Sequence, residues 1–124
     1  MVEKQSVATG VPGVFHNAKS VEDVAAGTVV FEEGAPSSQM YGVIEGEIEL
    51  RTGGGTVFKV GPNETFGEMG VIDHSARMAT AVATADSKLA VIDDGTFLFL
   101  VHETPMFALQ VMRTLTSRLR ARPV

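Results

Sequence analysis

The residues that could do chemistry are concentrated in residues 66–80, where a carboxylate lies between two glycines and an arginine follows nine positions later. Gly67 and Gly70 would let a ligand approach the main chain, because a Cβ atom at either position would interfere. Arg77 carries a planar guanidinium that matches two oxygens of one phosphate and stays charged at physiological pH. This guanidinium and the carboxylate of Glu68 are therefore candidates for one anion-binding site.

A short helix beginning at Glu68 would add unpaired N–H groups and the positive end of its dipole to this site. A carboxylate repels a bare phosphate, but it can accept a hydrogen bond from a hydroxyl group such as that of a ribose. Glu68 and Arg77 together therefore indicate a sugar phosphate rather than inorganic phosphate. The residue types alone are also compatible with a turn that carries a surface ion pair.

The composition of the chain excludes several other classes of protein. A domain of 124 residues can bury roughly two-thirds of its unfolded surface, and 44% hydrophobic with 20% charged residues is typical of a globular protein. The absence of cysteine excludes disulfides, thiolate metal sites and a thiol nucleophile. The N-terminus lacks a signal-like apolar stretch, and the longest apolar run, residues 97–101, is too short to span a bilayer. We therefore expect a soluble cytoplasmic protein.

The charges are unevenly distributed along the chain. Residues 1–103 carry a net charge of −9, whereas residues 104–124 carry four arginines and no acid. Proteins that bind nucleic acid usually present a broad basic face, so we expect no binding of nucleic acid by this chain alone. Arg118, Arg120 and Arg122 favour the negative end of a helix instead, and a patch for a membrane or an acidic partner is the lesser alternative.

Short β-rich segments separated by glycine and proline occupy most of residues 27–96. Their lengths and close spacing predict an antiparallel sandwich or barrel. Residues 47–51 alternate polar and apolar, as a strand with one solvated face does, and the glycine-rich residues 52–55 predict a hairpin loop after it. The expected strands are residues 28–31, 40–44, 47–51, 56–60, 78–84 and 88–92.

The pattern becomes helical after Asp93. Residues 97–101 predict a short helix, and Thr104 with Pro105 is typical of an N-cap and the first position of a second helix. Apolar residues then recur every four positions, which predicts an amphipathic helix over residues 105–121. Residues 1–20 show no clear periodicity, and we expect an N-terminal arm or weak helix there, before a single domain over residues 21–124.

Residues 66–80 resemble the phosphate-binding cassette of the cyclic nucleotide-binding domain family, whose usual form is Phe-Gly-Glu, an apolar turn and Pro-Arg-Ala-Ala-Thr. The spacing in this sequence fits that form without a gap. Residues 26–34 and 40–48 resemble the two glycine-marked strand pairs of the family, and the likeness extends over residues 21–121. The resemblance implies a mainly β fold, an antiparallel β jelly-roll barrel (double-stranded β-helix) with a short cassette helix and C-terminal helices.

The resemblance also implies a function. It implies a non-catalytic sensor or regulatory domain that binds cAMP or cGMP in signal transduction, with no metal. Arg77 would pair with the cyclic phosphate, Glu68 would accept the ribose 2′-hydroxyl, and the helix over residues 105–121 would act as lid and output. The candidate binding residues are Gly67, Glu68, Met69, Gly70, Arg77, Met78, Ala79 and Thr80.

Four positions depart from the family pattern. Ala76 replaces the usual proline, which predicts a less rigid turn before the arginine. Asn63 stands where a glycine is usual, and asparagine tolerates the left-handed conformation that such a turn requires. Met78 occupies a position where cGMP-selective members often place a hydroxyl, so it weakly favours cAMP. Gly70 replaces an alanine, a change we expect to be harmless.

Two other classes of function remain as alternatives. A degenerate barrel without nucleotide could serve as an interaction or dimerisation module, in which a homodimer or an effector protein uses the helix over residues 105–121. A cupin-type enzyme would need three or four converging metal ligands, but His16, His74 and His102 are far apart in the sequence. Because no helix-turn-helix follows the long helix, as it does in the bacterial transcription factors of the family, we expect a stand-alone module or an excised regulatory domain.

Overall fold

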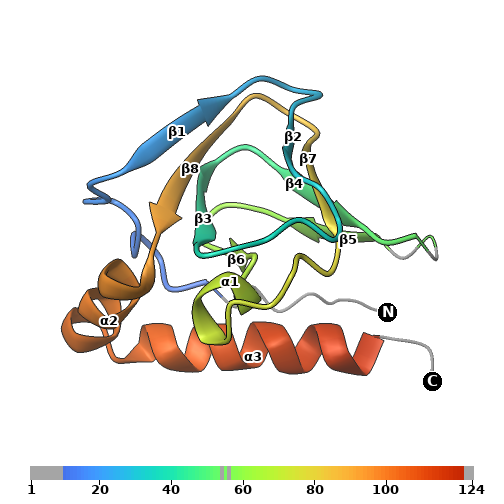
Figure 1. Ribbon diagram of the computed structural model, residues 1–124. Helices are drawn as coiled ribbons and strands as arrows, with labels where there is room; N and C mark the ends of the chain where they lie inside the picture. Colours follow the sequence, from blue (N-terminus) through green and yellow to red (C-terminus); the bar gives the residue numbers. More distant parts are fainter. Residues whose placement is uncertain (1–9, 54, 56, 122–124) are drawn as a thin grey trace, which may run out of the picture.

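The computed structural model describes residues 10–53, 55 and 57–121 (Figure 1). The first nine residues of the predicted arm, Gly54 and Thr56 of the predicted hairpin, and Arg122 lie outside the described residues. The described strands form two four-stranded antiparallel sheets, one in the order β1-β8-β3-β6 and the other in the order β2-β7-β4-β5. The elements are β1 (Val21–Val24), β2 (Val29–Phe31), β3 (Met40–Glu45), β4 (Ile48–Arg51), β5 (Val57–Val60), β6 (Thr65–Phe66), α1 (Met69–Ile72), β7 (Thr80–Ala83), β8 (Ser87–Ile92), α2 (Asp94–Glu103) and α3 (Met106–Ala121).

All six predicted strands are present, shifted at their ends by a few residues at most. The sequence analysis missed β1 and β6. The residues of β1 are mostly exposed and include two acids, so the segment lacks an alternating apolar pattern. β6 has only two residues. Its pairing with Tyr41 and Gly42 of β3 is a tertiary contact that no local sequence pattern indicates. In the described chain the two sheets face each other as a sandwich and do not close into one continuous barrel, because β1 and β6 end one sheet and β2 and β5 end the other.

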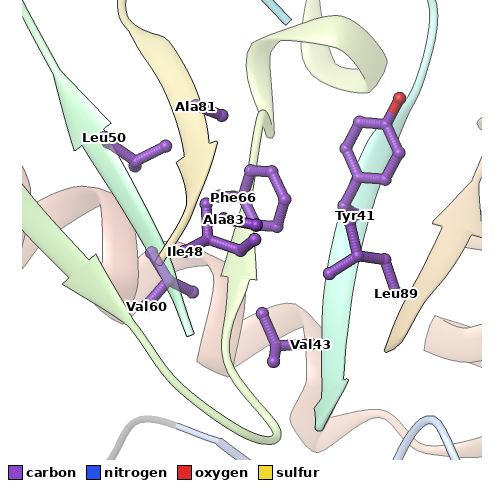
Figure 2. Close-up of a cluster of buried hydrophobic side chains, with 9 residues drawn as sticks. All are labelled: Tyr41, Val43, Ile48, Leu50, Val60, Phe66, Ala81, Ala83 and Leu89. Atoms are coloured by element: carbon purple, nitrogen blue, oxygen red, sulfur yellow. The ribbon is translucent and has the colours of Figure 1, made fainter. Parts of the chain in front are cut away.

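The main hydrophobic core fills the space between the two sheets. Strands β4 and β7 bury alternate residues, since Ile48 and Leu50 of β4 and Ala81 and Ala83 of β7 point inward. Figure 2 shows the buried side chains from both sheets directed toward one another. They are Tyr41, Val43, Ile48, Leu50, Val60, Phe66, Ala81, Ala83 and Leu89.

A second core lies on the other face of the β1-β8-β3-β6 sheet and attaches the helices to it. Phe107 and Val111 of α3 pack there with Met40, Ile92 and Ala90, and Phe15 from the N-terminal arm joins them. The described part of the arm forms hydrogen-bonded turns rather than a helix. A Cβ atom at Gly42 would lie 2.3 Å from the Phe15 ring, so glycine is required where the arm crosses β3.

The helices begin and end close to the predicted positions. α2 starts earlier than expected because the Asp93 side chain accepts a hydrogen bond from the Thr96 amide at 2.8 Å and caps its first turn. α3 runs along one end of the two sheets, beside α1 (Figure 1). None of the described helices has the length and apolar character that crossing a membrane requires.

A buried glutamine fixes α3 against the rest of the fold. Gln110 is almost completely buried, its side-chain Nε2 donates to the carbonyl of Asn63 at 2.7 Å, and its Oε1 accepts from the Val11 amide at 2.9 Å. Asn63 has a φ of 70°, which confirms the left-handed conformation predicted for it. The helix, the arm and the turn before β6 are therefore held together by one amide group.

Candidate functional site

A pocket of about 280 Å³ opens between the β2-β7-β4-β5 sheet, the cassette segment and the end of α3. Six of the eight residues predicted to bind ligand line it, namely Gly67, Glu68, Met69, Arg77, Met78 and Ala79. The other lining residues are Phe31, Leu50, Thr52, Phe58, Leu115, Arg118 and Leu119.

The two remaining predicted residues are placed differently. Thr80 lies at the start of β7, and its hydroxyl accepts a hydrogen bond from the Glu33 amide at 3.0 Å. Gly70 is buried within α1, and its amide donates to the carbonyl of Gly67 at 3.0 Å. A Cβ atom at Gly70 would lie 2.2 Å from the Gln39 carbonyl oxygen, so an alanine would force that main chain to shift. The glycine is thus a packing requirement in this chain, where we had expected a harmless replacement of alanine.

Gly67 is required for a different reason. Its φ is +76°, in the region that favours glycine. A Cβ atom there would lie 2.8 Å from Nη1 of Arg77 and 3.3 Å from the Phe31 ring. Because glycine has no Cβ atom, the guanidinium can occupy this space.

Arg77 is a buried cation with unused hydrogen-bonding capacity. Only 7% of the residue is exposed. Nη1 donates to the carbonyl of Gly67 at 3.1 Å, while the buried Nε has no hydrogen-bond partner in the part of the chain that the structure describes. Burial lowers the pKa of the guanidinium, and Tyr41 and Glu68 act in the opposite direction, so the group remains charged. A buried donor without a partner calls for an explanation, and an anion held at Arg77 is one partner that would supply it.

The turn that presents Arg77 is restrained without the usual proline. The Asp73 carboxylate accepts a hydrogen bond from the Ser75 amide at 3.0 Å, and the hydrogen bonds from Ser75 lower the pKa of that carboxyl. The Ser37 hydroxyl donates to the carbonyl of Ser75 at 2.7 Å. These bonds restrain the backbone before Ala76, and the Arg77 amide, which donates to the carbonyl of Ala35 at 2.9 Å, restrains it after Ala76. Together they compensate for the rigidity that we expected this alanine to remove.

Glu68 is neutralised by an arginine from α3. Only 3% of Glu68 is exposed, and Nη1 of Arg118 donates to its two carboxylate oxygens at 2.9 and 3.2 Å. The Thr65 hydroxyl adds a bond to Oε2 at 2.6 Å, and Nη2 of Arg118 donates to the Thr65 carbonyl at 2.6 Å. Cassette and helix are thus joined by a charge-assisted network at the pocket wall.

Arg118 was not predicted as a pocket residue; the expectations for it were a role at the helix terminus or, as the lesser alternative, in a patch for a membrane or an acidic partner. A signal was available, because the residues of α3 that face the core continue to this position: Val111 and Thr114 are buried, and Arg118 lies four residues beyond Thr114 on the same side. Its partner Glu68 is 50 residues away in the sequence, so the pairing itself could not be inferred locally. Phe31 was also missed, since its position before a turn gave no indication of a pocket.

The described residues contain no group of three or more histidine, aspartate or glutamate side chains that could hold a metal ion. The three histidines named above are all exposed. His74 lies 3.2 Å from Asp94 and His102 lies 3.1 Å from Glu103, as surface pairs.

Comparison with known proteins identifies the class to which this pocket belongs. A family model for the cyclic nucleotide-binding domain matches residues 21–104, so the chain belongs to this family. A solved structure from work on a cyclic-GMP-dependent signalling pathway in bacterial phytopathogenesis superimposes with a TM-score of 0.75 at 32% identity, and the match covers 90% of this chain and 93% of the other. The predicted fold class, mainly β of the jelly-roll type with flanking helices, is confirmed.

Two relatives show how the same domain occurs in longer proteins. The cyclic AMP receptor protein of Thermus thermophilus is 34% identical over 99 residues, which are 76% of this chain and 46% of that protein. A putative potassium channel protein of Rhodopseudomonas palustris is 30% identical over 98 residues, which are 77% of this chain and 24% of the channel. The chain therefore spans less than half the length of these relatives.

The ion pair at the pocket wall leads to a first prediction. We expect Arg118→Ala to lower the free energy of unfolding by about 2–3 kcal/mol, because it leaves the Glu68 carboxylate buried with only the Thr65 hydroxyl. Glu68→Gln should recover part of that loss in the Arg118→Ala background, since the unpaired charge is then gone. Urea unfolding measures both effects.

The matched control for this prediction is Arg120→Ala, which removes the same side chain from the same last turn of α3 at an exposed position. Its expected effect is within about 0.5 kcal/mol. If the two arginine variants lost equal free energy of unfolding, the Arg118–Glu68 pair would contribute nothing to stability beyond the general effect of an arginine at the helix terminus.

Proposed function

We propose that this chain is a non-catalytic sensor domain that binds a cyclic nucleotide, with the cyclic phosphate on Arg77 and the ribose 2′-hydroxyl on Glu68. The observation that carries the proposal is the buried guanidinium of the pocket, whose Nε finds no partner among the described residues. A cyclic phosphodiester carries one negative charge, which a single guanidinium can balance. The role requires no catalytic group and no metal, and we propose a cytoplasmic location for it.

The arrangement of charges supports binding of a sugar phosphate. Arg118 balances the charge of Glu68, so that the carboxylate does not repel a phosphate bound to Arg77. Oε1 of Glu68 accepts a hydrogen bond from Arg118, and a carboxylate oxygen has room for a second donor. A ribose hydroxyl can therefore bind without displacing the arginine.

The apolar side of the pocket supports binding of a purine base. Leu50 and Phe58 of the β4–β5 hairpin, Leu115 and Leu119 of α3, and Met78 all line the pocket. The methionine offers a guanine amino group no good acceptor, and on this ground we favour cAMP over cGMP. The Thermus thermophilus relative is named for cyclic AMP, whereas one similar structure comes from work on a cyclic-GMP-dependent pathway, so a test of the ligand needs both nucleotides.

The typical energies of charge-assisted hydrogen bonds are sufficient for binding in the micromolar range. A charge-assisted hydrogen bond is worth about 1.5–3 kcal/mol. Three or four of them, together with contact to the base, can supply the roughly 8 kcal/mol of a micromolar complex after the costs of ordering.

Titration calorimetry with cAMP and cGMP tests the proposed ligand. We expect saturable heat for at least one of them, and a loss of at least about 2 kcal/mol of binding energy, or about thirtyfold in Kd, for Arg77→Ala, because the variant lacks the charged phosphate partner. Arg113→Ala, an exposed arginine of α3, is the control and should bind as the wild type does. Absence of heat at millimolar concentrations of both nucleotides would contradict the proposal.

We also propose that α3 is the lid and output element. Three of its residues, Leu115, Arg118 and Leu119, line the pocket, so a bound nucleotide touches the helix directly. Leu119 is 71% exposed and would lose solvent contact if a base packed against it.

This role leads to a prediction for hydrogen–deuterium exchange. We expect saturating cAMP to slow amide exchange in residues 112–121, because contact with the ligand reduces the local opening of the last turns of the helix. The α2 amides, which belong to no part of the pocket, serve as the internal control. A ligand effect confined to the cassette, with unchanged exchange in α3, would exclude the lid.

A second candidate, an interaction or dimerisation module, is favoured by the outer face of α3. Three large apolar side chains are exposed on this helix and do not line the pocket, those of Met106, Leu109 and Met112. Light scattering distinguishes the candidates. For a module that uses only this face, we expect a dimer that Leu109→Glu disrupts and that neither nucleotide affects, together with no heat in the titrations. A monomer that binds nucleotide would exclude this second candidate.

A further inference from the structure

The charge of Arg77 is balanced in an unusual way. Among the described residues, no carboxylate bonds to its guanidinium, since Glu68, the acid whose charge acts on it, accepts its hydrogen bonds from Arg118 and Thr65. The Arg77 Cζ atom instead lies 4.1 Å from the centroid of the Phe31 ring and 5.9 Å from that of Tyr41. An aromatic face attracts a guanidinium, most strongly where water is excluded.

The Phe31 ring is held in place by two other rings. Its centroid lies 5.8 Å from that of Phe66 and 6.1 Å from that of Tyr41, and these two rings stack on each other at 5.2 Å. Phe31 belongs to the β2-β7-β4-β5 sheet, whereas its two neighbours belong to the opposite sheet. The ring therefore lies between the sheets at the cassette, in contact with aromatic side chains of the opposite sheet.

The segment that carries this ring also holds the main chain of the arginine. The Arg77 amide donates to the carbonyl of Ala35 at 2.9 Å, and the Arg77 carbonyl accepts from the amide of Gly34 at 2.8 Å. Residues 31–35 thus contact both ends of the residue, the guanidinium through Phe31 and the backbone through the turn that follows β2. This double contact fixes where the side chain can reach.

We propose that Phe31 is a positioning residue for Arg77: its ring face holds the buried guanidinium in the pocket without an anionic partner, so that the remaining N–H groups stay available to a phosphate. A carboxylate in the same place would hold the arginine equally well, but an incoming phosphate would have to displace it. The aromatic ring stabilises the cation without accepting the N–H hydrogen bonds that a carboxylate would take up. The proposal deepens the proposed function and rests on it for the identity of the anion.

Calorimetric titration of Phe31→Leu tests the effect on binding. The leucine keeps an apolar side chain but has no ring face, and we expect the Kd of cAMP or cGMP to rise about tenfold, which corresponds to about 1.4 kcal/mol. Phe15→Leu is the matched control, because it removes a buried ring from the second core that makes no contact with the pocket, and its Kd should change less than about twofold. Circular dichroism melting identifies a temperature at which both variants are folded.

A double-mutant cycle without ligand supplies the second measurement. Phe31→Leu, Arg77→Met and the double variant are unfolded in urea, and we expect the midpoint of the double variant to fall by less than the sum of the two single shifts, because the ring and the guanidinium stabilise each other. Additive shifts, or equal rises in Kd for the variants at positions 31 and 15, would overturn the proposal.

The two proposals fail in different ways. If the wild type binds neither nucleotide, the proposed function is wrong, and the urea cycle still decides whether Phe31 positions Arg77. If the wild type binds and Phe31→Leu binds equally well, the function stands and the positioning role is wrong.

Discussion

The separation of two buried charges is the constraint on which the site depends. Glu68 and Arg77 lie in the same pocket, and a direct ion pair between them would leave neither group available to a ligand. In this fold Arg118 neutralises the carboxylate, and the Phe31 ring lies against the guanidinium. Each charge is thereby compensated separately, which keeps both side chains buried without coupling them tightly to each other.

This arrangement connects the pocket to the C-terminal helix. Arg118 is part of the last turns of α3 and also the counter-ion of a cassette residue, so the helix cannot leave its place without exposing or unpairing Glu68. At its other end the same helix is held by Phe107 in the second core and by the buried Gln110. The proposed output element is therefore attached by apolar packing and Gln110 at its start, and by the bonds of Arg118 to Glu68 and Thr65 near its end.

Much of the fold was predictable because it follows from local periodicity in the sequence. The alternation in residues 47–51, the four-residue spacing from Phe107 and the glycine-marked turns each specify an element without reference to the rest of the chain. The strands β1 and β6 were not predictable, since one is an exposed edge and the other is defined only by its pairing with β3. The requirement for glycine at position 70 was likewise not predictable, because it arises from the close approach of the Gln39 carbonyl in the folded chain.

By itself the sequence determined that a glycine-flanked carboxylate and an arginine share one segment, because their spacing is a local property of the chain and resembles a known cassette. It also determined an amphipathic helix at the C-terminal end, through its apolar period. Only the tertiary structure decided which charge faces which group. Arg118 and Phe31 reach the pocket from elements 50 and 46 positions away from Glu68 and Arg77, and such pairings arise when the sheets and α3 pack together.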